Sequence, residues 1–311
     1  MDRGSASLLT RWRLPHFSWP SPASFLVWGH VSPIPLPPDR ARAWHCTTRL
    51  DDDDVLTRTP GELRDVVRSV LRHGQPAGLL CFAVIDTHLH VLLCGRRADA
   101  GEAMRRIELA CHRLLLLDRR FQGARIRPVE DQLHLTNTVH YILRQPLHHA
   151  VAGDGLNEGS AIHDLLGLRV PGLPLPGVLL TELPRMRVAE LLPHLGLSSD
   201  ELTGWDFPLT EAELPWLLDS AAAAFAVRDM LRRSKHCASL RAAMVRAVGD
   251  EVATGRIAAH TGLARSSICR LRARPVDAAW VRCVRRQVRL RIAVTLRRDA
   301  EPLGMSPESA R

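Results

Sequence analysis

The apolar stretch over residues 77–95, "AGLLCFAVIDTHLHVLLCG", restricts the fold of this chain more than any other segment. Its hydrophobic run is interrupted near Asp86 and Thr87, which predicts two short buried strands rather than one helix. The second strand contains His88 and His90, two polar side chains in an otherwise apolar segment. The chain is therefore expected to form a sheet in which one strand carries two histidines.

Further helices and strands are predicted on both sides of these two strands. A strand is expected over 43–50, helices over 59–73 and 99–120, a strand over 124–129, and a helix over 131–150 that is interrupted at Pro146. Thr59 is the expected N-cap of the first helix, because Pro60 and Glu62 follow it at the positions typical of a helix start. The order β-α-β-β-α-β-α is typical of a small α+β domain with an antiparallel sheet.

Charge is distributed unevenly along the 311 residues. The whole chain carries a net charge of +9, but residues 228–298 alone carry +14 and residues 171–227 carry −6. We divide the chain into a Pro-rich extension expected to be disordered (1–40), an α+β domain (41–170), a linker with an acidic helical segment (171–227), a basic helical region (228–298) and a tail (299–311). The basic region points to an anionic partner, with nucleic acid first and a membrane surface second.

Residue usage argues against three classes of protein. No run of about 18 uncharged apolar residues exists, so a membrane-spanning protein is not expected. The seven cysteines are odd in number and contain no CxxC pair, which excludes a disulfide scaffold and a zinc ribbon. The expectation is a cytoplasmic protein with reduced thiols.

Two pairs of residues point to chemistry. His88 and His90 alternate on a strand, so both imidazoles face the same way and can bind one divalent ion. Tyr141, the single tyrosine of the chain, lies one helical turn before Gln145 on the same face of a predicted helix. A tyrosine oxygen is a competent nucleophile for phosphoryl transfer, and an amide oxygen can be a hard metal ligand. Taken singly, each pair is also compatible with ordinary packing.

Together, three segments resemble a known family. "AWHCTTR", "CFAVIDTHLHVLLCG" and "FQGARIRPVEDQLHLTNTVHYILRQPLHHAV" follow one another in the order seen in the REP-associated tyrosine transposases, bacterial single-tyrosine transposases of the HUH (His-hydrophobic-His) type. That family typically shows "MPNHxH", "FQGRY" and "YIxxNPV". This chain departs from the pattern at Asp86 and Thr87 before the first histidine, at Gln145, and at Ala124, where the family has an aromatic residue. The resemblance covers residues 43–170.

The resemblance implies a ferredoxin-like antiparallel sheet that carries the histidines beneath the tyrosine helix. It assigns roles residue by residue: Tyr141 as the nucleophile, His88 and His90 as metal ligands, Gln145 as third ligand or phosphate-positioning group, and Arg125 and Arg127 as DNA contacts. The implied cofactor is Mg²⁺ or Mn²⁺. The implied substrate is single-stranded DNA with hairpin-forming repeats. The implied location is the bacterial cytoplasm, at the nucleoid. Whether the protein acts as a monomer or as a homodimer stays open.

The implied reaction is transesterification through a 5′-phosphotyrosine, which conserves the ester bond for later rejoining. Two alternatives stay open. One is a DNA-binding regulator that has kept the fold without the chemistry. The other is a related HUH nuclease of replication or plasmid mobilisation, although the "FQG" and tyrosine-helix arrangement resembles transposases more. A cleavage assay on hairpin-bearing single-stranded DNA tests the first alternative, and a gene position between inverted palindromic repeats would be the most informative further observation.

The C-terminal part carries a helix-turn-helix pattern at residues 255–274, "GRIAAHTGLARSSICRLRAR". Gly262 is placed at the turn, and Ile257, Ile268 and Leu271 are expected to face inward. The residues left to face DNA are Arg265, Ser267, Arg270, Arg272 and Arg274. Arginines at 282, 285, 286, 289 and 291 repeat at helical spacing, which favours phosphate contact over a merely solvated face. The C-terminal region is thus expected to be all-α and to bind DNA.

Overall fold

The structure is a computed structural model, and it describes residues 41–51, 54–149, 156, 158–170, 188–198, 204–232 and 235–300. The expected extension over 1–40, the Pro/Gly-rich linker that follows Val170, and residues 301–311 lie outside these ranges. No helix within the described residues is both long enough and apolar enough to cross a bilayer.

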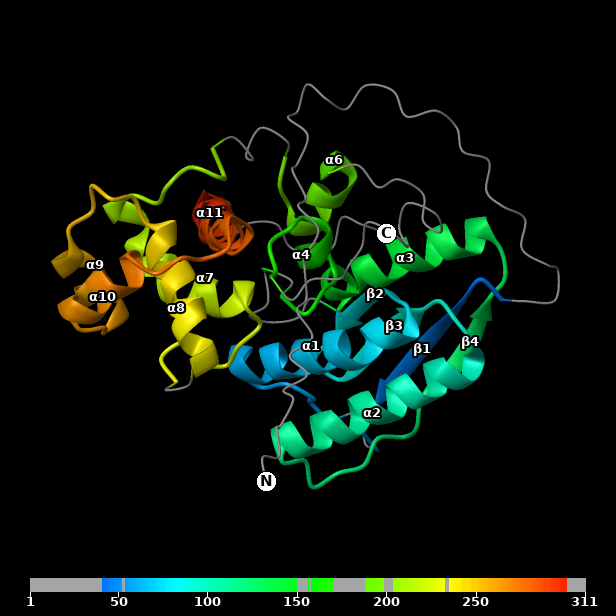
Figure 1. Ribbon diagram of the computed structural model, residues 1–311. Coiled ribbons are helices and arrows are strands. Elements are labelled where there is room, and N and C mark those ends of the chain that lie inside the picture. The colour runs from blue at the N-terminus through cyan, green and yellow to red at the C-terminus, as the bar shows by residue number, and fades with distance from the viewer. Residues whose placement is uncertain are drawn as a thin grey trace, which may run out of the picture. The chain divides into compact units, whose positions relative to one another are not determined.

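Four antiparallel strands form the sheet of the N-terminal part (Figure 1). The elements follow in the order β1 (Ala43–Arg49), α1 (Pro60–Gly74), η3 (Gln75–Ala77), β2 (Leu79–Val84), β3 (His88–Leu93), α2 (Arg97–Leu115), β4 (Arg125–Val129) and α3 (Gln132–His148). The strand order across the sheet is β2-β3-β1-β4. The predicted α+β class with an antiparallel sheet is confirmed.

Local sequence explains where α1 begins. The Thr59 side chain accepts a hydrogen bond from the Glu62 N–H at 3.2 Å, and the Glu62 carboxylate accepts one from the Thr59 N–H at 3.2 Å. This reciprocal pair satisfies two amide groups that the first turn leaves without helical partners. The predicted capping box is therefore confirmed.

Helix α3 differs from the prediction at Pro146. The sequence predicts an interruption there, but the helix continues through Pro146 and ends at His148. A proline this close to the end removes only one backbone hydrogen bond from the last turns, so the helix tolerates it. The Gln145 carbonyl still accepts a hydrogen bond from the His149 N–H at 3.0 Å. Continuity through this turn keeps Tyr141 and Gln145 on one rigid element.

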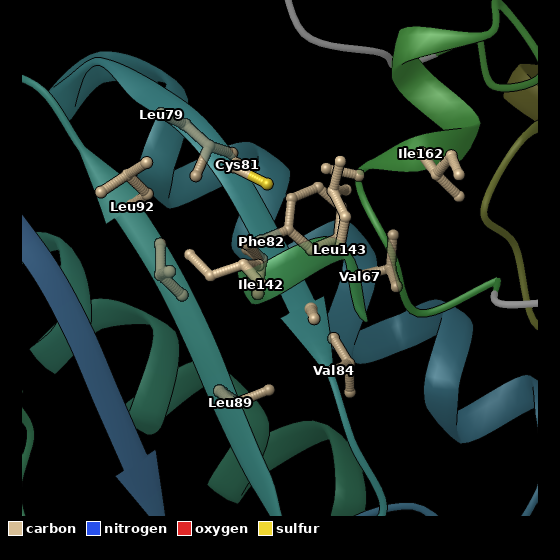
Figure 2. Packing of buried hydrophobic residues seen from close by; sticks show 14 of the residues in the cluster. Val67, Leu79, Cys81, Phe82, Val84, Leu89, Leu92, Ile142, Leu143 and Ile162 are labelled. Atoms are coloured by element: carbon tan, nitrogen blue, oxygen red, sulfur yellow. The ribbon is translucent and has the colours of Figure 1, made fainter. Parts of the chain in front are cut away.

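The two faces of the sheet are covered by different helices. Thr48, on β1, donates a hydrogen bond to Glu108 of α2 at 2.6 Å, so its face lies beneath α1 and α2 (Figure 1). The opposite face carries His45 and His90, whose rings lie against Tyr141 of α3. The core between the layers includes side chains from β2, β3, α1 and α3 (Figure 2). Helices α1 and α2 thus lie on one side of the sheet, and α3 lies on the other.

The C-terminal part is helical and has its own hydrophobic cluster. Its elements, with the short helices that precede it, are α4 (Ile162–Leu165), α6 (Val188–Leu191), η4 (Leu192–Leu195), η6 (Glu211–Trp216), α7 (Leu217–Ala224), α8 (Lys235–Ala247), α9 (Thr254–Thr261), α10 (Arg265–Arg272) and α11 (Ala278–Ala300). Ile257 and Ile268 are both fully buried in this cluster. Gly262 has φ 70°, a left-handed conformation suited to glycine, and it begins the short turn between α9 and α10.

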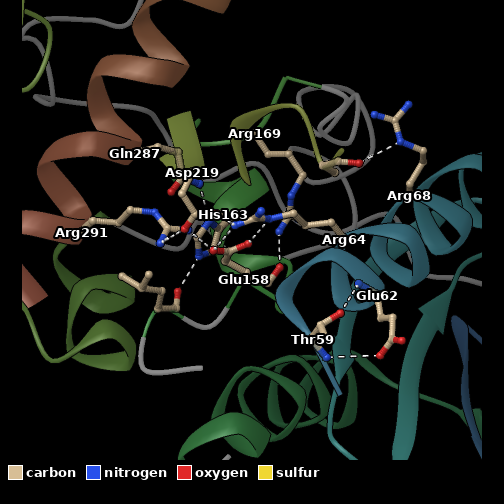
Figure 3. A network of polar contacts seen from close by, with 12 residues as sticks. Thr59, Glu62, Arg64, Arg68, Glu158, His163, Arg169, Asp219, Gln287 and Arg291 are labelled. Atoms are coloured by element: carbon tan, nitrogen blue, oxygen red, sulfur yellow. Dashed lines mark hydrogen bonds and ion pairs between the residues drawn. The ribbon is translucent and has the colours of Figure 1, made fainter. Parts of the chain in front are cut away.

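A buried ion cluster joins the helical part to the sheet domain (Figure 3). The Glu158 carboxylate accepts hydrogen bonds from Arg64 of α1, at 2.8 and 3.1 Å, and from Arg291 of α11. Asp219 of α7 binds the same two guanidinium groups, each at 2.6 Å. The Glu158 side chain is 7% exposed. The cluster therefore ties together three helices from two parts of the chain.

Helix α1 makes further polar contacts with the segment after α7. Arg68 donates to the carbonyl of Ala226 at 2.8 Å and to that of Phe225 at 2.6 Å. Arg228 pairs with Asp65 at 2.7 Å. Arg68 lies four residues after Arg64 and three after Asp65, so its side chain neighbours both of them on α1. These residues of α1 form one of the contacts between the helical part and the sheet domain.

Candidate functional site

Strand register gathers polar side chains on the open face of the sheet. Residues that face each other on neighbouring antiparallel strands project to the same side. His90 of β3 lies opposite Thr47 of β1, and Thr47 lies opposite Arg125 of β4. In the same way His45 lies opposite Arg127. Imidazole, hydroxyl and guanidinium groups therefore share one face in adjacent rows.

Helix α3 brings Tyr141 and Gln145 to that face. The Tyr141 ring meets the His90 ring edge-on with centroids 5.5 Å apart, and the two ring planes make an angle of 86°. His88 and His90 have centroids 4.8 Å apart. Tyr141 is 49% exposed, whereas Gln145 and His90 are almost completely buried. All four residues predicted to carry the chemistry lie together, with the tyrosine accessible from outside.

Both histidines of the pair have the same ring nitrogen engaged. The Nδ1 atom of His90 lies 3.0 Å from Nε2 of His45, and Nδ1 of His88 lies 3.0 Å from the Thr87 hydroxyl. The Nε2 atom of His90 is buried and has no hydrogen-bond partner. A buried polar atom without a partner is costly, so this nitrogen is a natural position for a ligand.

Burial keeps the imidazoles of His45 and His90 neutral. Desolvation first, and then the imidazoles of His45, His88 and His149, lower the pKa of His90 to about 3, against the opposing effect of Gln145. Desolvation, with smaller contributions from Arg127 and His134, lowers the pKa of His45 to about 4. A neutral imidazole offers a lone pair, which is the form that binds a metal ion.

Two hollows open beside Tyr141 and share His88, His90, Tyr141 and His149. The first measures about 650 Å³ and is otherwise bounded by α3, through Asn137, His140, Arg144, Gln145 and His148. The second measures about 510 Å³ and is bounded by the sheet and its loops, through His45, Thr47, Thr48, Arg49, Thr87, Gln122, Gly123, Arg125 and Arg127. Both hollows are lined by arginine and histidine side chains, which can donate hydrogen bonds to a polyanion.

The residues at this site fit a divalent cation, and they offer it a small set of ligands. Within the described ranges, no group of three or more His, Cys, Asp or Glu residues is placed to hold a metal ion. The predicted set instead consists of two imidazoles and the amide of Gln145, with the unpartnered Nε2 of His90 among them. Imidazole and amide oxygen are accepted ligands of divalent ions, and so small a set leaves coordination positions for a phosphate.

Sequence reasoning missed two members of the site. His45 contacts both His90 and Tyr141, with centroids 5.3 and 5.9 Å away. It alternates with Thr47 and Arg49 along β1, a period-two pattern that could have placed all three on one face. His149 lies against His88 with centroids 4.9 Å apart, just after the end of α3. No sequence signal identifies His149.

The predicted DNA contacts differ in how far they are free to reach DNA. Arg125 and Arg127 are exposed and line the sheet-side hollow. On α10, Arg265 and Arg270 are exposed and Ser267 is half-buried. Arg272 donates to the carbonyls of Gly249 and Val252 at 3.1 and 2.7 Å, and Arg274 donates to the Ser239 hydroxyl at 3.1 Å. The Arg272 side chain is thus already engaged in hydrogen bonds within the fold.

Four of the five arginines on the predicted phosphate-binding face of α11 already bind groups within the fold. Arg286 pairs with Asp206 at 2.7 Å, and Arg289 pairs with Glu213 at 3.1 Å. Arg285 donates to the carbonyls of Ala247 and Asp206, and Arg291 belongs to the buried ion cluster. Their partners come mostly from the acidic segment, so the charges of −6 and +14 neutralise one another in part inside the fold.

Among the comparisons with known proteins, only the one with solved structures gives a match. No family model matches the chain, and no curated protein matches it. A solved structure described as "Structure of the REP associates tyrosine transposase bound to a REP hairpin" is 18% identical and covers 50% of this chain and 99% of its own. Its TM-score is 0.35, too low to decide fold or function. The chain is thus similar to a member of the family that residues 43–170 resemble.

Proposed function

We propose that this protein cleaves and rejoins single-stranded DNA through a covalent 5′-phosphotyrosine on Tyr141. One observation carries the proposal: the half-exposed Tyr141 lies edge-on to His90, whose buried Nε2 atom lacks a partner. A nucleophile accessible to a large substrate thus lies beside a nitrogen suited to a cation. In the proposed reaction the Tyr141 oxygen bonds to the scissile phosphorus while the bond from phosphorus to the 3′ oxygen breaks. The phenol loses a proton and the departing strand gains one as a 3′-OH.

His88, His90 and Gln145 are the residues that would hold a Mg²⁺ or Mn²⁺ ion. A divalent ion bound there supplies Lewis-acid polarisation of the scissile phosphate. The chain itself supplies rigid placement: the histidines lie on one strand, and Tyr141 and Gln145 lie on one helix. Placement of this kind lowers the barrier because the reacting groups need no further ordering.

The arginines of the sheet-side hollow are the proposed contacts for the DNA backbone next to the scissile phosphate. Arg125 and Arg127 are exposed there, on an edge strand beside the sheet face that bears His90.

We further propose that α9 and α10 act as a helix-turn-helix, with Arg265 and Arg270 toward duplex DNA. The sheet is proposed to be of the ferredoxin-like type, which the order β2-β3-β1-β4 supports.

A labelled-strand assay tests the proposed reaction. Hairpin-bearing single-stranded DNA is incubated with the protein and Mg²⁺ or Mn²⁺, and adducts that survive denaturing gels are scored. A 5′-phosphotyrosine retains the label of a 3′-labelled strand and releases the label of a 5′-labelled strand, and chelation of the metal abolishes both products. Intact duplex binding without any adduct would favour the alternative of a DNA-binding regulator. An adduct that keeps the 5′ label would reverse the proposed polarity.

Removing the two arginines of β4 is expected to weaken single-stranded DNA binding. A protein that loses two phosphate contacts releases fewer counterions on binding. We therefore expect Arg125→Ala with Arg127→Ala to reduce the slope of log affinity against log salt by about 1.4. Fluorescence anisotropy at several salt concentrations measures this slope. The charge-matched control is Arg105→Ala with Arg106→Ala, because these exposed arginines of α2 pair with Glu102 outside both hollows. Equal slopes in the two double variants would remove β4 from the proposed DNA path.

A further inference from the structure

His45 makes a specific contact to a proposed metal ligand from a different strand. Its Nε2 atom lies 3.0 Å from Nδ1 of His90, and the two rings are nearly parallel, with an interplanar angle of 20°. His45 also meets the edge of Tyr141. His45 therefore touches both a proposed ligand and the proposed nucleophile from the sheet side.

The contact determines which nitrogen of His90 is available. An imidazole that binds a cation through Nε2 is neutral and carries its proton on Nδ1. That N–H needs an acceptor, and in metal sites it usually donates to a group just outside the ligands, which fixes ring orientation and tautomer. Here the atom facing Nδ1 of His90 is Nε2 of His45. His45 can accept this hydrogen bond when its own proton is on Nδ1.

The neighbouring ligand shows the same arrangement with a different partner. The hydroxyl of Thr87 lies 3.0 Å from Nδ1 of His88. Both histidines thus have Nδ1 engaged, one by an adjacent hydroxyl and the other by an imidazole 45 residues earlier in the chain. A packing role alone would not require an acceptor at that position, since any aromatic ring could fill the space.

We propose that His45 is a positioning residue, which holds His90 in the Nδ1-protonated tautomer with Nε2 directed to a divalent cation. The inference rests on the proposed metal site of His88, His90 and Gln145, and it assigns His45 no contact with substrate. Loss of the acceptor is expected to weaken cation binding by about 10- to 100-fold, the usual effect of removing such a partner. His45→Gln keeps a side-chain oxygen within reach of His90 and is expected to restore most of the affinity.

Titration with Mn²⁺ alone, followed by electron paramagnetic resonance of the free ion, tests the inference without DNA or activity. The variants are His45→Phe, which keeps a ring but no acceptor, His45→Gln, and His112→Phe as a control on the exposed face of α2. We expect weakened binding in His45→Phe and near-normal binding in the other two. Equal affinity in His45→Phe and the unaltered protein would overturn the inference. Failure of the unaltered protein to bind Mn²⁺, or binding unaffected by His90→Gln, would instead overturn the proposed metal site.

A second measurement needs no variant at position 45 to fold. Long-range ¹H–¹⁵N correlation spectra of the metal-free protein report the tautomer of each histidine, and the His90 signals are assigned by their loss in His90→Gln. The expected result is a proton on Nδ1 of His90. A proton on Nε2 would contradict the role proposed for His45, whatever the affinity for Mn²⁺.

Discussion

A Tyr141→Phe variant is expected to form no covalent adduct with single-stranded DNA while folding normally and binding DNA as before. Phenylalanine keeps the ring that meets His45 and His90 and removes only the hydroxyl. Because Tyr141 is the single tyrosine of the chain, no other phenol can replace it. Loss of an enzyme nucleophile costs many orders of magnitude in rate, so we expect the adduct to fall by at least about a thousandfold. Denaturing gels quantify the adduct, and mass spectrometry of the unaltered protein locates it.

The control lies on the same helix. Leu133→Ala removes a side chain that is 70% exposed in the first turn of α3 and lines neither hollow, so adduct formation should not change. Undiminished adduct in Tyr141→Phe would mean that another residue is the nucleophile. Loss of DNA binding together with the adduct would mean that the hydroxyl contributes to binding, and the chemical role would then need a separate demonstration.

The parts of the site that could be predicted from the sequence depend on short-range spacing. His88 and His90 share a face because a strand alternates, and Tyr141 and Gln145 share one because a helix repeats after four residues. The Thr59 capping box is equally local. Each of these patterns involves residues at most four positions apart, so no knowledge of tertiary contacts was needed.

The features that could not be predicted depend on contacts between distant segments. His45 meets His90 only because β1 pairs with β3, and the sequence does not specify that register. Arg286 looked free for phosphate because its partner, Asp206, lies 80 residues away. A helix with regularly spaced arginines is compatible with solvent, DNA or buried ion pairs. Only the position of the acidic segment decides among these for α11.

Replacing Glu158 by alanine is expected to be the most destabilising single change in the region that joins the two parts of the chain. The variant would remove the buried carboxylate that Arg64 and Arg291 share, and would leave these side chains, 5% and 9% exposed, with the half-exposed Asp219 as their common partner. Removing one partner of a buried ion pair costs about 3–5 kcal/mol, because the remaining charge stays desolvated. Urea denaturation followed by circular dichroism measures the free energy of unfolding. Glu102→Ala is the matched control, since Glu102 also pairs with two arginines but is exposed, and its loss should have no measurable effect.

The same cluster predicts a dependence of stability on pH. Burial alone would raise the pKa of Glu158, but the ion pairs with Arg64 and Arg291 and the nearby charge of Arg169 outweigh burial and hold the pKa below its ordinary value. A carboxyl group whose pKa is lowered by folding stabilises the protein at pH values above its ordinary pKa. That contribution is lost as the pH falls through the lowered pKa. The difference in unfolding free energy between the unaltered protein and Glu158→Gln should therefore be largest near neutral pH and shrink on acidification. A difference independent of pH would show that shape and hydrogen bonding at Glu158, rather than its charge, hold α1, α7 and α11 together.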